Sequence, residues 1–294
     1  MKLIIHRGTH EIGGSCVELQ SNKTRIIIDI GMPLVNPTGE KFNIKEYDGI
    51  SGEELVNKKV LPDIKGIYKW DMINMKADGV LISHPHMDHY GLFSYLREDT
   101  NYYLGEATKK IIDMTCIFTS MKGSINDYVP LESGKGFDIG DFKITPFLMD
   151  HSAYDAYAFL IEAEGKKIIY SGDFREHGRK VNAFKYFLKV APKNIDALIL
   201  EGTMFGRDNE EVKTEQQIED QVNKLVMRNK GITLMNFSAQ NIDRVVSMFR
   251  VAKRNNKIFV VDFYSANILS ILRDTIPHPS FKYPRVQNIE IYCR

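Results

Sequence analysis

The sequence has few of the features that mark secreted or membrane proteins. It contains three cysteines among 294 residues, an odd number, spread over positions 16, 116 and 293. This argues against a disulfide framework and predicts a cytoplasmic protein, because the reducing cytosol keeps thiols free. No run of about 18 apolar residues is present, so we expect no membrane span. Charge interrupts the N-terminal apolar run early, which predicts a first strand and no signal peptide.

A marked excess of charge of either sign is also missing. Lys and Arg total 39 and Asp and Glu total 38, so the formal net charge is +1. This excludes a generally basic nucleic-acid coat protein but allows a local basic groove, because a phosphate site needs only a few cations on one face. The hydrophobic fraction of 43% and charged fraction of 26% are typical of a globular protein with one large domain or two ordinary ones.

Short apolar runs separated by turns predict a strand-rich first part of the chain. The predicted strands cover residues 2–6, 16–19, 25–30, 80–83, 142–147, 158–162, 167–170 and a buried run at 197–200. Residues 33–66 are polar and interrupted by Pro and Gly, which indicates an irregular connection, and residues 91–96 have helical spacing.

The pattern changes after about residue 205. Helical patterns at 210–228, 241–253 and 266–273 alternate there with strand-like runs at 232–236 and 258–262. This alternation predicts α/β units with a parallel sheet. We therefore expect two domains, residues 1–207 and 208–294, in a chain of mixed α/β (α+β) class.

A dense group of metal-ligand residues follows the strand predicted at 80–83. His84, His86, Asp88 and His89 fall within six residues. In an extended segment residues i and i+2 point the same way, so His84 and His86 can share one ion. Asp88 and His89 lie where the chain turns into a helix and can face a second ion. Imidazole and carboxylate suit zinc, and a position between strand and helix argues against a mere surface cluster of histidines.

Two further candidate ligands follow later predicted strands. His151 comes after residues 145–150, and Asp173 after residues 167–170. A carboxylate at Asp173 can bridge two cations about 3.5–4 Å apart. Each of the two would be an ordinary loop residue if taken alone, and the upstream histidines make the ligand interpretation the favoured one.

Together with Asp29 before Gly31, this set resembles the metallo-β-lactamase fold superfamily. The resemblance implies an αββα sandwich in which Asp29 orients the histidine loop from behind the ligands. A plain turn aspartate is the alternative for Asp29. Segments 61–64, 79–91, 151–152 and 171–174 resemble the ribonuclease J-like members, whereas the Gly-His-Thr-Pro-Gly-His string of thioesterase-type members is absent.

Later segments resemble the β-CASP group of nucleic-acid-processing members. Residues 200–203 resemble the acidic motif that opens the β-CASP region, and residues 237–244 with 258–262 resemble its α/β part. Ser238, Asn241 and Arg244 open a predicted helix, where N–H groups and the helix dipole favour phosphate, although helix capping explains them equally well. The basic stretch 175–180 is expected to form a solvated face.

The resemblance implies a zinc-dependent hydrolase of phosphodiester bonds, with RNA the expected partner and single-stranded DNA a less favoured one. It assigns His84, His86 and His151 to one zinc ion, and Asp88, His89 and bridging Asp173 to a second. It also implies two catalytic carboxylates. Asp88 would orient the attacking hydroxide, and Glu201 would hydrogen-bond a histidine that protonates the leaving oxygen. A solvent-facing Glu201 is the alternative.

The pattern is incomplete at its end. The family carries further histidines beyond the β-CASP region, one paired with the Glu201-type residue and one completing the second metal site. His278, the one histidine after Glu201, fits neither motif, and the chain ends in a strand-like run at 289–294. We therefore expect a shortened member with an incomplete β-CASP domain, an incomplete second zinc site and exposed sheet edges that favour homo-oligomers.

Two other functions are compatible with the same residues. One is a small-molecule ester or thioester hydrolase on this fold. The other is a non-catalytic nucleic-acid-binding remnant, which the missing histidines favour.

Overall fold

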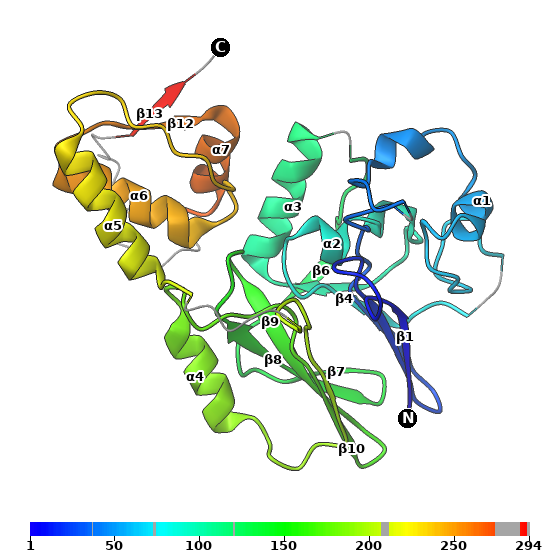
Figure 1. The fold of residues 1–294 in the computed structure, drawn as a ribbon. Coiled ribbons are helices and arrows are strands. Elements are labelled where there is room, and N and C mark those ends of the chain that lie inside the picture. Colours follow the sequence, from blue (N-terminus) through cyan, green and yellow to red (C-terminus); the bar gives the residue numbers. More distant parts are fainter. Residues whose placement is uncertain (37, 73–74, 120, 207–211, 274–288, 293–294) are drawn as a thin grey trace.

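Two mixed β-sheets form the centre of the molecule in the computed structural model, which describes residues 1–36, 38–72, 75–119, 121–206, 212–273 and 289–292 (Figure 1). The first sheet contains β1 (Lys2–Arg7), β2 (Cys16–Gln20), β3 (Arg25–Ile28), β4 (Gly79–Leu81), β5 (Tyr102–Leu104) and β6 (Tyr128–Pro130), paired in that order. The second contains β7 (Phe137–Ile139), β8 (Phe142–Met149), β9 (Ala156–Ala163), β10 (Lys166–Tyr170) and β11 (Ala197–Ile199), also paired in chain order.

Helices cover the outer face of each sheet. The helices η1 (Ile44–Tyr47), α1 (Gly52–Asn57), α2 (Met87–Tyr90), η2 (Phe93–Tyr95) and α3 (Glu106–Phe118) accompany the first sheet, and α4 (Val181–Val190) accompanies the second. On α4, Phe187 packs against Phe147 of β8 with ring centroids 5.5 Å apart.

The alternation of side chains along the strands explains the layers. In β3, Ile26 and Ile28 belong to the core between the sheets, together with Phe159 of β9, while Ile27 faces the opposite core with Ile112 of α3. Successive residues of a strand point to opposite faces, so an unbroken isoleucine run serves two cores at once. The layers are therefore helix, sheet, sheet and helix, which confirms the predicted αββα sandwich.

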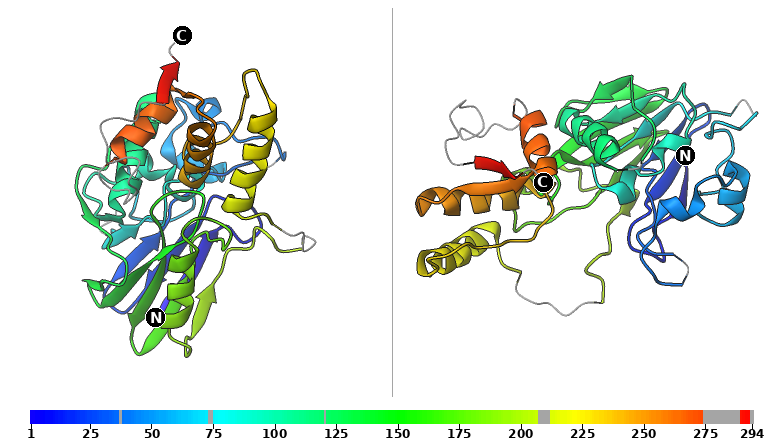
Figure 2. Two further views of the ribbon diagram at one scale, coloured as in Figure 1. Left: turned by 90° about the vertical axis from the view of Figure 1, so that its left-hand side faces the viewer. Right: turned by 90° about the horizontal axis from the view of Figure 1, so that it is seen from above.

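A smaller α/β unit lies against α3 (Figures 1 and 2). Its elements are α5 (Glu215–Arg228), α6 (Ile242–Arg254), β12 (Phe259–Asp262), α7 (Phe263–Ile271) and β13 (Ile289–Tyr292). The pair β12–β13 is parallel, as the alternating pattern predicts. Ala107 and Ile111 of α3 share one buried cluster with Val245 and Phe249 of α6. The boundary predicted between residues 207 and 208 lies outside the described residues.

The structure corrects two expectations about strands. The run at 197–200 is not buried, because Leu198 is 54% and Leu200 56% exposed. The reason is that β11 pairs with β10 alone in the described part of the chain. Residues 232–236, all described, form no strand, and Ile232 and Leu234 are 88% and 91% exposed.

Candidate metal centre

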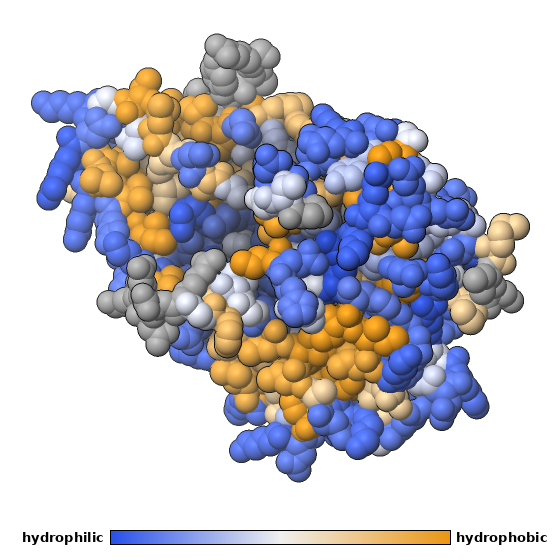
Figure 3. Space-filling view, turned by 45° about the vertical axis from the view of Figure 1, so that its right-hand side comes forward, coloured by the Kyte–Doolittle hydropathy of each residue, from blue (hydrophilic) through white to orange (hydrophobic). Residues whose placement is uncertain are grey.

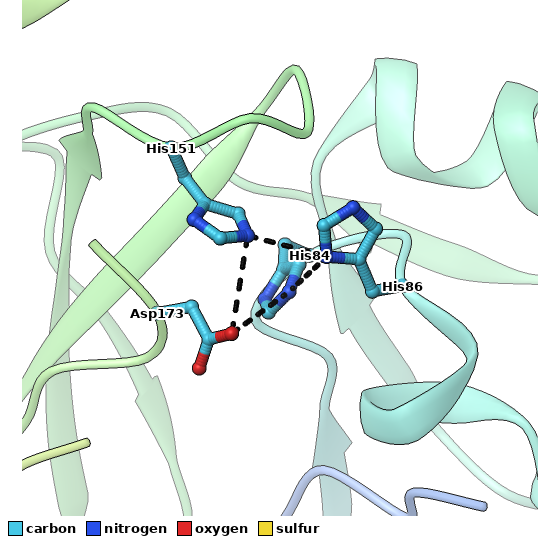
Figure 4. A group of neighbouring side chains, drawn as sticks. All are labelled: His84, His86, His151 and Asp173. Carbon is cyan, nitrogen blue, oxygen red and sulfur yellow. Dashed lines mark hydrogen bonds and ion pairs between the residues drawn. The ribbon is translucent and has the colours of Figure 1, made fainter. Parts of the chain in front are cut away.

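Four candidate ligands from both sheets converge at the strand ends (Figure 4). His84 and His86 follow β4, His151 follows β8, and Asp173 follows β10. One ligand atom from each of the four lies within 4.8 Å of the others. His86 Nδ1 is 3.1 Å from His84 Nε2 and 3.2 Å from His151 Nε2. The fold thus brings together residues that are up to 89 positions apart, from His84 to Asp173.

The two carboxylate oxygens of Asp173 face different sets of side chains. Oδ2 lies 3.9 Å from Nε2 of His84 and 3.9 Å from Nε2 of His151. Oδ1 lies 3.4 Å from His89 Nε2, which is itself 3.8 Å from Asp88 Oδ2. This geometry is compatible with a bridging Asp173. The assignment of Asp88 and His89 to a second ion stays a prediction.

Asp29 holds the segment that carries His84, His86 and His89 in place. It is fully buried, and its carboxylate accepts hydrogen bonds from Ser83 N at 2.7 Å, Ser83 Oγ at 2.8 Å and the Tyr170 hydroxyl at 2.6 Å. It also lies 2.7 Å from His89 Nδ1, while Ser83 Oγ lies 3.0 Å from His84 Nδ1. Because Nδ1 of both rings is engaged in this way, Nε2 of His84 and of His89 is left to face the centre and is available to a metal.

Gly31 is required by the close approach of the same loop. Ser15 donates its N–H to the Asp88 carbonyl at 3.1 Å and accepts from Gly31 N at 2.9 Å. A Cβ at Gly31 would overlap the Asp88 carbonyl and crowd the Ser15 nitrogen, both of them backbone atoms. The glycine therefore lets the strand end and the ligand loop lie in direct contact.

The protonation states of the cluster suit a cation. Burial lowers the pKa of His84 and of His151 well below its usual value, and neighbouring imidazoles lower it further. Burial alone would raise the pKa of Asp173, but the hydrogen bond and charge of His89 hold it at about 2. Neutral imidazoles and an ionised carboxylate are donors that zinc binds. The four residues therefore fit the metal expected from the sequence.

His89 has a different electrostatic setting. Burial alone would lower its pKa, but the carboxylates of Asp29 and Asp173 raise it well above its usual value. The His89 ring therefore lies between the carboxylates of Asp29 and Asp173.

Glu201 anchors the segment that carries Asp173. Its Oε1 accepts a hydrogen bond from Phe174 N at 2.8 Å, and its own N–H donates to Ser171 Oγ at 3.1 Å. The predicted pairing of Glu201 with a proton-donating histidine stays a prediction. His278 lies outside the described residues.

Two cavities meet at the centre. One, of about 430 Å³, is bordered by Asp88, His89, Asp173 and Glu201. The other, of about 490 Å³, is bordered by His86 and Asp88, so that Asp88 lies between the two. Exposed apolar residues, Ile5, Ile12, Leu200 and Phe205, line the first cavity. The space-filling view shows hydrophobic side chains gathered over a broad area of one face (Figure 3).

An ionic network links the smaller unit to His151. Asp243 of α6 accepts hydrogen bonds from Arg175 Nη2 at 2.5 Å and from Arg179 N at 2.9 Å, and it lies 3.5 Å from Lys180 Nζ. Lys180 Nζ in turn donates to the His151 carbonyl at 3.1 Å. Lys180 thus connects the Asp243 carboxylate of α6 to the backbone of His151, a candidate metal ligand.

The expectation of a solvated basic face at 175–180 is wrong for three of its members. The side chains of Arg175, Arg179 and Lys180 are only 10%, 18% and 14% exposed, because buried carboxylates of α5 and α6 face them. One sequence feature could have predicted this burial. Glu215 and Glu219 lie four residues apart, and so on one face of a helix, where they can pair with the basic run.

The three residues predicted weakly for nucleic-acid contact have local partners. Asn241 Oδ1 caps α6 by accepting from Arg244 N at 3.2 Å, and Ser238 Oγ accepts from Gln240 N at 3.3 Å. The Arg244 guanidinium forms two hydrogen bonds with Glu215, at 3.0 and 3.1 Å. Helix capping therefore accounts for Asn241, and phosphate binding by these residues stays a prediction.

Comparison with known proteins identifies the family. The sequence model of the Beta-lactamase superfamily domain matches residues 73–236, which include all four clustered ligands. The chain belongs to the metallo-β-lactamase superfamily. None of the helices that the structure describes is long and apolar enough to cross a membrane.

This superfamily member is similar to two curated ribonucleases. It is 23% identical to Ribonuclease J of Mycoplasma pneumoniae in an alignment that covers 87% of this chain and 42% of that protein. It is 24% identical to Ribonuclease J of Helicobacter pylori, over 94% of this chain and 40% of that protein. The chain thus spans less than half the length of these relatives.

A solved structure shares the fold. A protein of unknown function from Enterococcus faecalis V583 superimposes with a TM-score of 0.77 at 21% identity. The match covers 99% of this chain and 73% of that one, so the sandwich and the smaller unit occur together in both.

Proposed function

We propose that this chain is a zinc-dependent nuclease that hydrolyses RNA phosphodiester bonds. The convergence of ligand atoms from His84, His86, His151 and Asp173 within 4.8 Å carries the proposal. The similarity to proteins named Ribonuclease J supports RNA as the substrate class. The cavities on both sides of Asp88 support an extended substrate that passes across the centre.

Our proposal divides the candidate ligands between two zinc ions. His84, His86, His151 and Asp173 would hold a first zinc ion, and Asp88 and His89 would hold a second together with Asp173. Bound zinc would polarise a phosphoryl oxygen and lower the pKa of nearby water.

The protein itself supplies positioning and proton transfer. We assign to Asp88 the orientation of the attacking water and acceptance of its proton, since it borders both cavities. Asp29 and Ser83 hold the imidazole rings, and Glu201 holds the Asp173 segment through the Phe174 N–H.

We also propose a cytoplasmic site of action. Cys16 and Cys116 are free thiols, in keeping with a reducing compartment. Self-association stays a prediction. It rests on the edge positions of β1 and β11, each of which pairs with one strand in the described part of the chain.

Cleavage of a labelled single-stranded RNA tests the proposal. The protein is stripped of metal with a chelator, reloaded with zinc and compared on RNA, on DNA of the same sequence and on a thioester. We expect zinc-dependent cleavage of the RNA that falls on the order of 10²–10⁴-fold in Asp88→Asn. Asp138→Asn, a change of an exposed carboxylate on β7, is the matched control and should cleave normally.

The same assay distinguishes the small-molecule hydrolase and the non-catalytic nucleic-acid-binding remnant from the nuclease. Thioester turnover without RNA cleavage would replace the nuclease with a small-molecule hydrolase. RNA binding with no zinc-dependent cleavage would indicate the non-catalytic remnant.

A further inference from the structure

A third cavity lies on the helix-covered side of the first sheet. Its volume is about 450 Å³, within the range of about 300–1,000 Å³ that is usual for small-molecule pockets. The chain around η1, the short helices α2 and η2 and the segment after α3 all border it. Among the described residues of its wall, none belongs to the four clustered metal ligands, so this cavity is distinct from the metal centre.

The wall of the third cavity is largely apolar. Phe42 and Tyr47 stack on each other there, with ring centroids 5.4 Å apart. Both belong to the hydrophobic cluster between the first sheet and its helices. The other apolar wall residues are Met32, Ile44, Ile50, Met87, Tyr95 and Met121. Three of these are methionines, whose flexible side chains adapt to ligands of different shape.

The rim of the third cavity carries positive charge. Lys45, Lys69 and Lys122 border it and are exposed. Asp48 is the one carboxylate among its described wall residues. In the part of the chain that the structure describes, none of the three lysines forms an ion pair. An anion at this rim would therefore meet three cations that have no carboxylate partner there.

Backbone hydrogen bonds hold two of these lysines in position. Asn43 Oδ1 accepts from Lys45 N at 3.2 Å and so caps η1. Lys69 N donates to the Tyr95 carbonyl at 3.1 Å, which ties Lys69 to η2, a helix that forms part of the wall. The backbone at the rim is thus fixed relative to the apolar wall before any ligand binds, which lowers the cost of binding.

We propose that the third cavity binds a small organic anion with an apolar body. The body would pack against Phe42, Tyr47 and the methionines, and the anionic group would lie at the rim among the lysines. A neutral apolar molecule would gain nothing from the three cations, and a small anion such as acetate would leave the apolar wall uncovered. This site goes beyond the proposed nuclease activity and does not depend on it.

Isothermal titration calorimetry with 1-naphthoate tests the proposal. The neutral alcohol 1-naphthalenemethanol has the same rings without the charge, and acetate has the charge without the rings. We expect 1-naphthoate to bind about 10-fold more tightly than the alcohol, and acetate to give no measurable binding. The advantage of 1-naphthoate should shrink as salt is added, because salt screens charges at an exposed rim.

Removal of the lysines separates the effect of charge from that of shape. The triple variant Lys45→Gln, Lys69→Gln and Lys122→Gln should bind 1-naphthoate no better than the alcohol, and the alcohol as well as the wild type does. The three side chains are exposed, so we expect this variant to fold. The matched control loses the same charge from exposed positions of β8 and α4 and should keep the full preference: Lys143→Gln, Lys185→Gln and Lys189→Gln.

Titrations with and without zinc show where the anion binds. A carboxylate that coordinates zinc would bind only the metal-loaded protein, whereas binding in the third cavity should be equal in both states. Binding that requires zinc, no binding of 1-naphthoate, equal affinity for 1-naphthoate and the alcohol, or a preference that the control loses as well would overturn the site. Tighter binding of adenosine 5′-monophosphate, whose polar base and ribose do not match an apolar wall, would overturn it too. RNA cleavage enters none of these measurements, so failure of this site would leave the nuclease proposal standing.

Discussion

At the scale of single residues, the convergence of the ligands depends on side chains that touch no metal. Asp29 receives hydrogen bonds from Ser83 and Tyr170 and fixes His89. Gly31 lets the backbone of the ligand loop lie directly against the end of β3. A cluster of buried imidazoles is costly to assemble, and these neighbours hold it in one arrangement.

Gly31→Ala tests this dependence. The added Cβ must push back the Asp88 carbonyl, so we expect a loss of about 1–3 kcal/mol in the free energy of unfolding. Displacement of the loop should also weaken zinc binding about 10-fold or more. Urea denaturation and competition with a chelating dye measure the two effects. Gly231→Ala, where the nearest atom is Asn229 Oδ1 at 3.6 Å, is the control, and equal behaviour of both variants would contradict this role of Gly31.

The sequence predicts the four clustered candidate ligands, His151 and Asp173 included, but it does not predict which residues surround them. The histidine string can be found because His84, His86, Asp88 and His89 are neighbours and their spacing has a geometric meaning. Gln240, which hydrogen-bonds Thr115 and Tyr264 beside the second cavity, cannot be found that way. Gln240 lies 125 residues from Thr115 and 24 from Tyr264, and only the packing of the smaller unit on α3 joins them.

At the scale of elements, β2 carries a buried charge between β1 and β3 of the first sheet. Glu18 lies between His6 of β1 and Arg25 of β3 and also contacts Gln20. Burial alone would raise its pKa, but the hydrogen bonds from His6, Arg25 and Gln20 lower it to about 2. The ionised carboxylate therefore links three adjacent strand segments.

The depressed pKa of Glu18 predicts a pH-dependent contribution to stability. A carboxyl group whose pKa is lower in the folded state stabilises the fold above its unfolded pKa, about 4.5, and loses this effect as pH falls toward about 2. Wild type should exceed Glu18→Gln by roughly 1–2 kcal/mol in free energy of unfolding at pH 7, after allowance for solvent screening.

Denaturation of both proteins across this pH range checks the sign. The difference should shrink between pH 4.5 and pH 2, the interval between the two pKa values. Glu132→Gln, which affects an exposed pair with Lys135, should change stability by less than about 1 kcal/mol. A difference that stays constant or grows on acidification would show that Glu18 does not act through its charge.

Strand prediction succeeded at alternating or β-branched apolar runs, and the prediction of burial failed where burial depends on neighbouring strands. The runs that became β2, β3, β8 and β9 were found by composition and alternation. The 197–200 run has the same apolar composition, yet β11 lies at a sheet edge with Leu198 exposed. No local signal distinguishes an edge strand from a central one, because pairing is a property of the whole sheet.

At the scale of the whole molecule, the smaller unit is held to the sandwich by charge as well as by the apolar contact with α3. Asp243 of α6 binds Arg175 and the N–H of Arg179, and Lys180 connects it to the His151 carbonyl. The views in Figure 2 show α5 and α6 beside the sandwich and not within it. The position of His151 is thereby coupled to the docking of the smaller unit.

Asp243→Asn should weaken both functions of this network. Loss of the Asp243 charge removes its ion pairs with Arg175 and Lys180, so we expect a drop of about 1–3 kcal/mol in the free energy of unfolding. Zinc affinity should fall about 10-fold, because Lys180, which binds the His151 carbonyl, would lose its contact with the Asp243 charge. Asp220→Asn on the exposed face of α5 is the control. Reduced stability with unchanged zinc affinity would show that the network does not position His151.

The number of zinc ions retained per chain tests the central claim most directly. Native mass spectrometry after exhaustive dialysis should find one zinc ion on the wild-type chain and a second only when zinc is added in excess. His86→Ala and His151→Ala, checked by circular dichroism for folding, should retain none after dialysis. A wild-type chain that keeps no zinc, or folded variants that keep as much as the wild type, would contradict the assignment of the metal centre to His84, His86, His151 and Asp173.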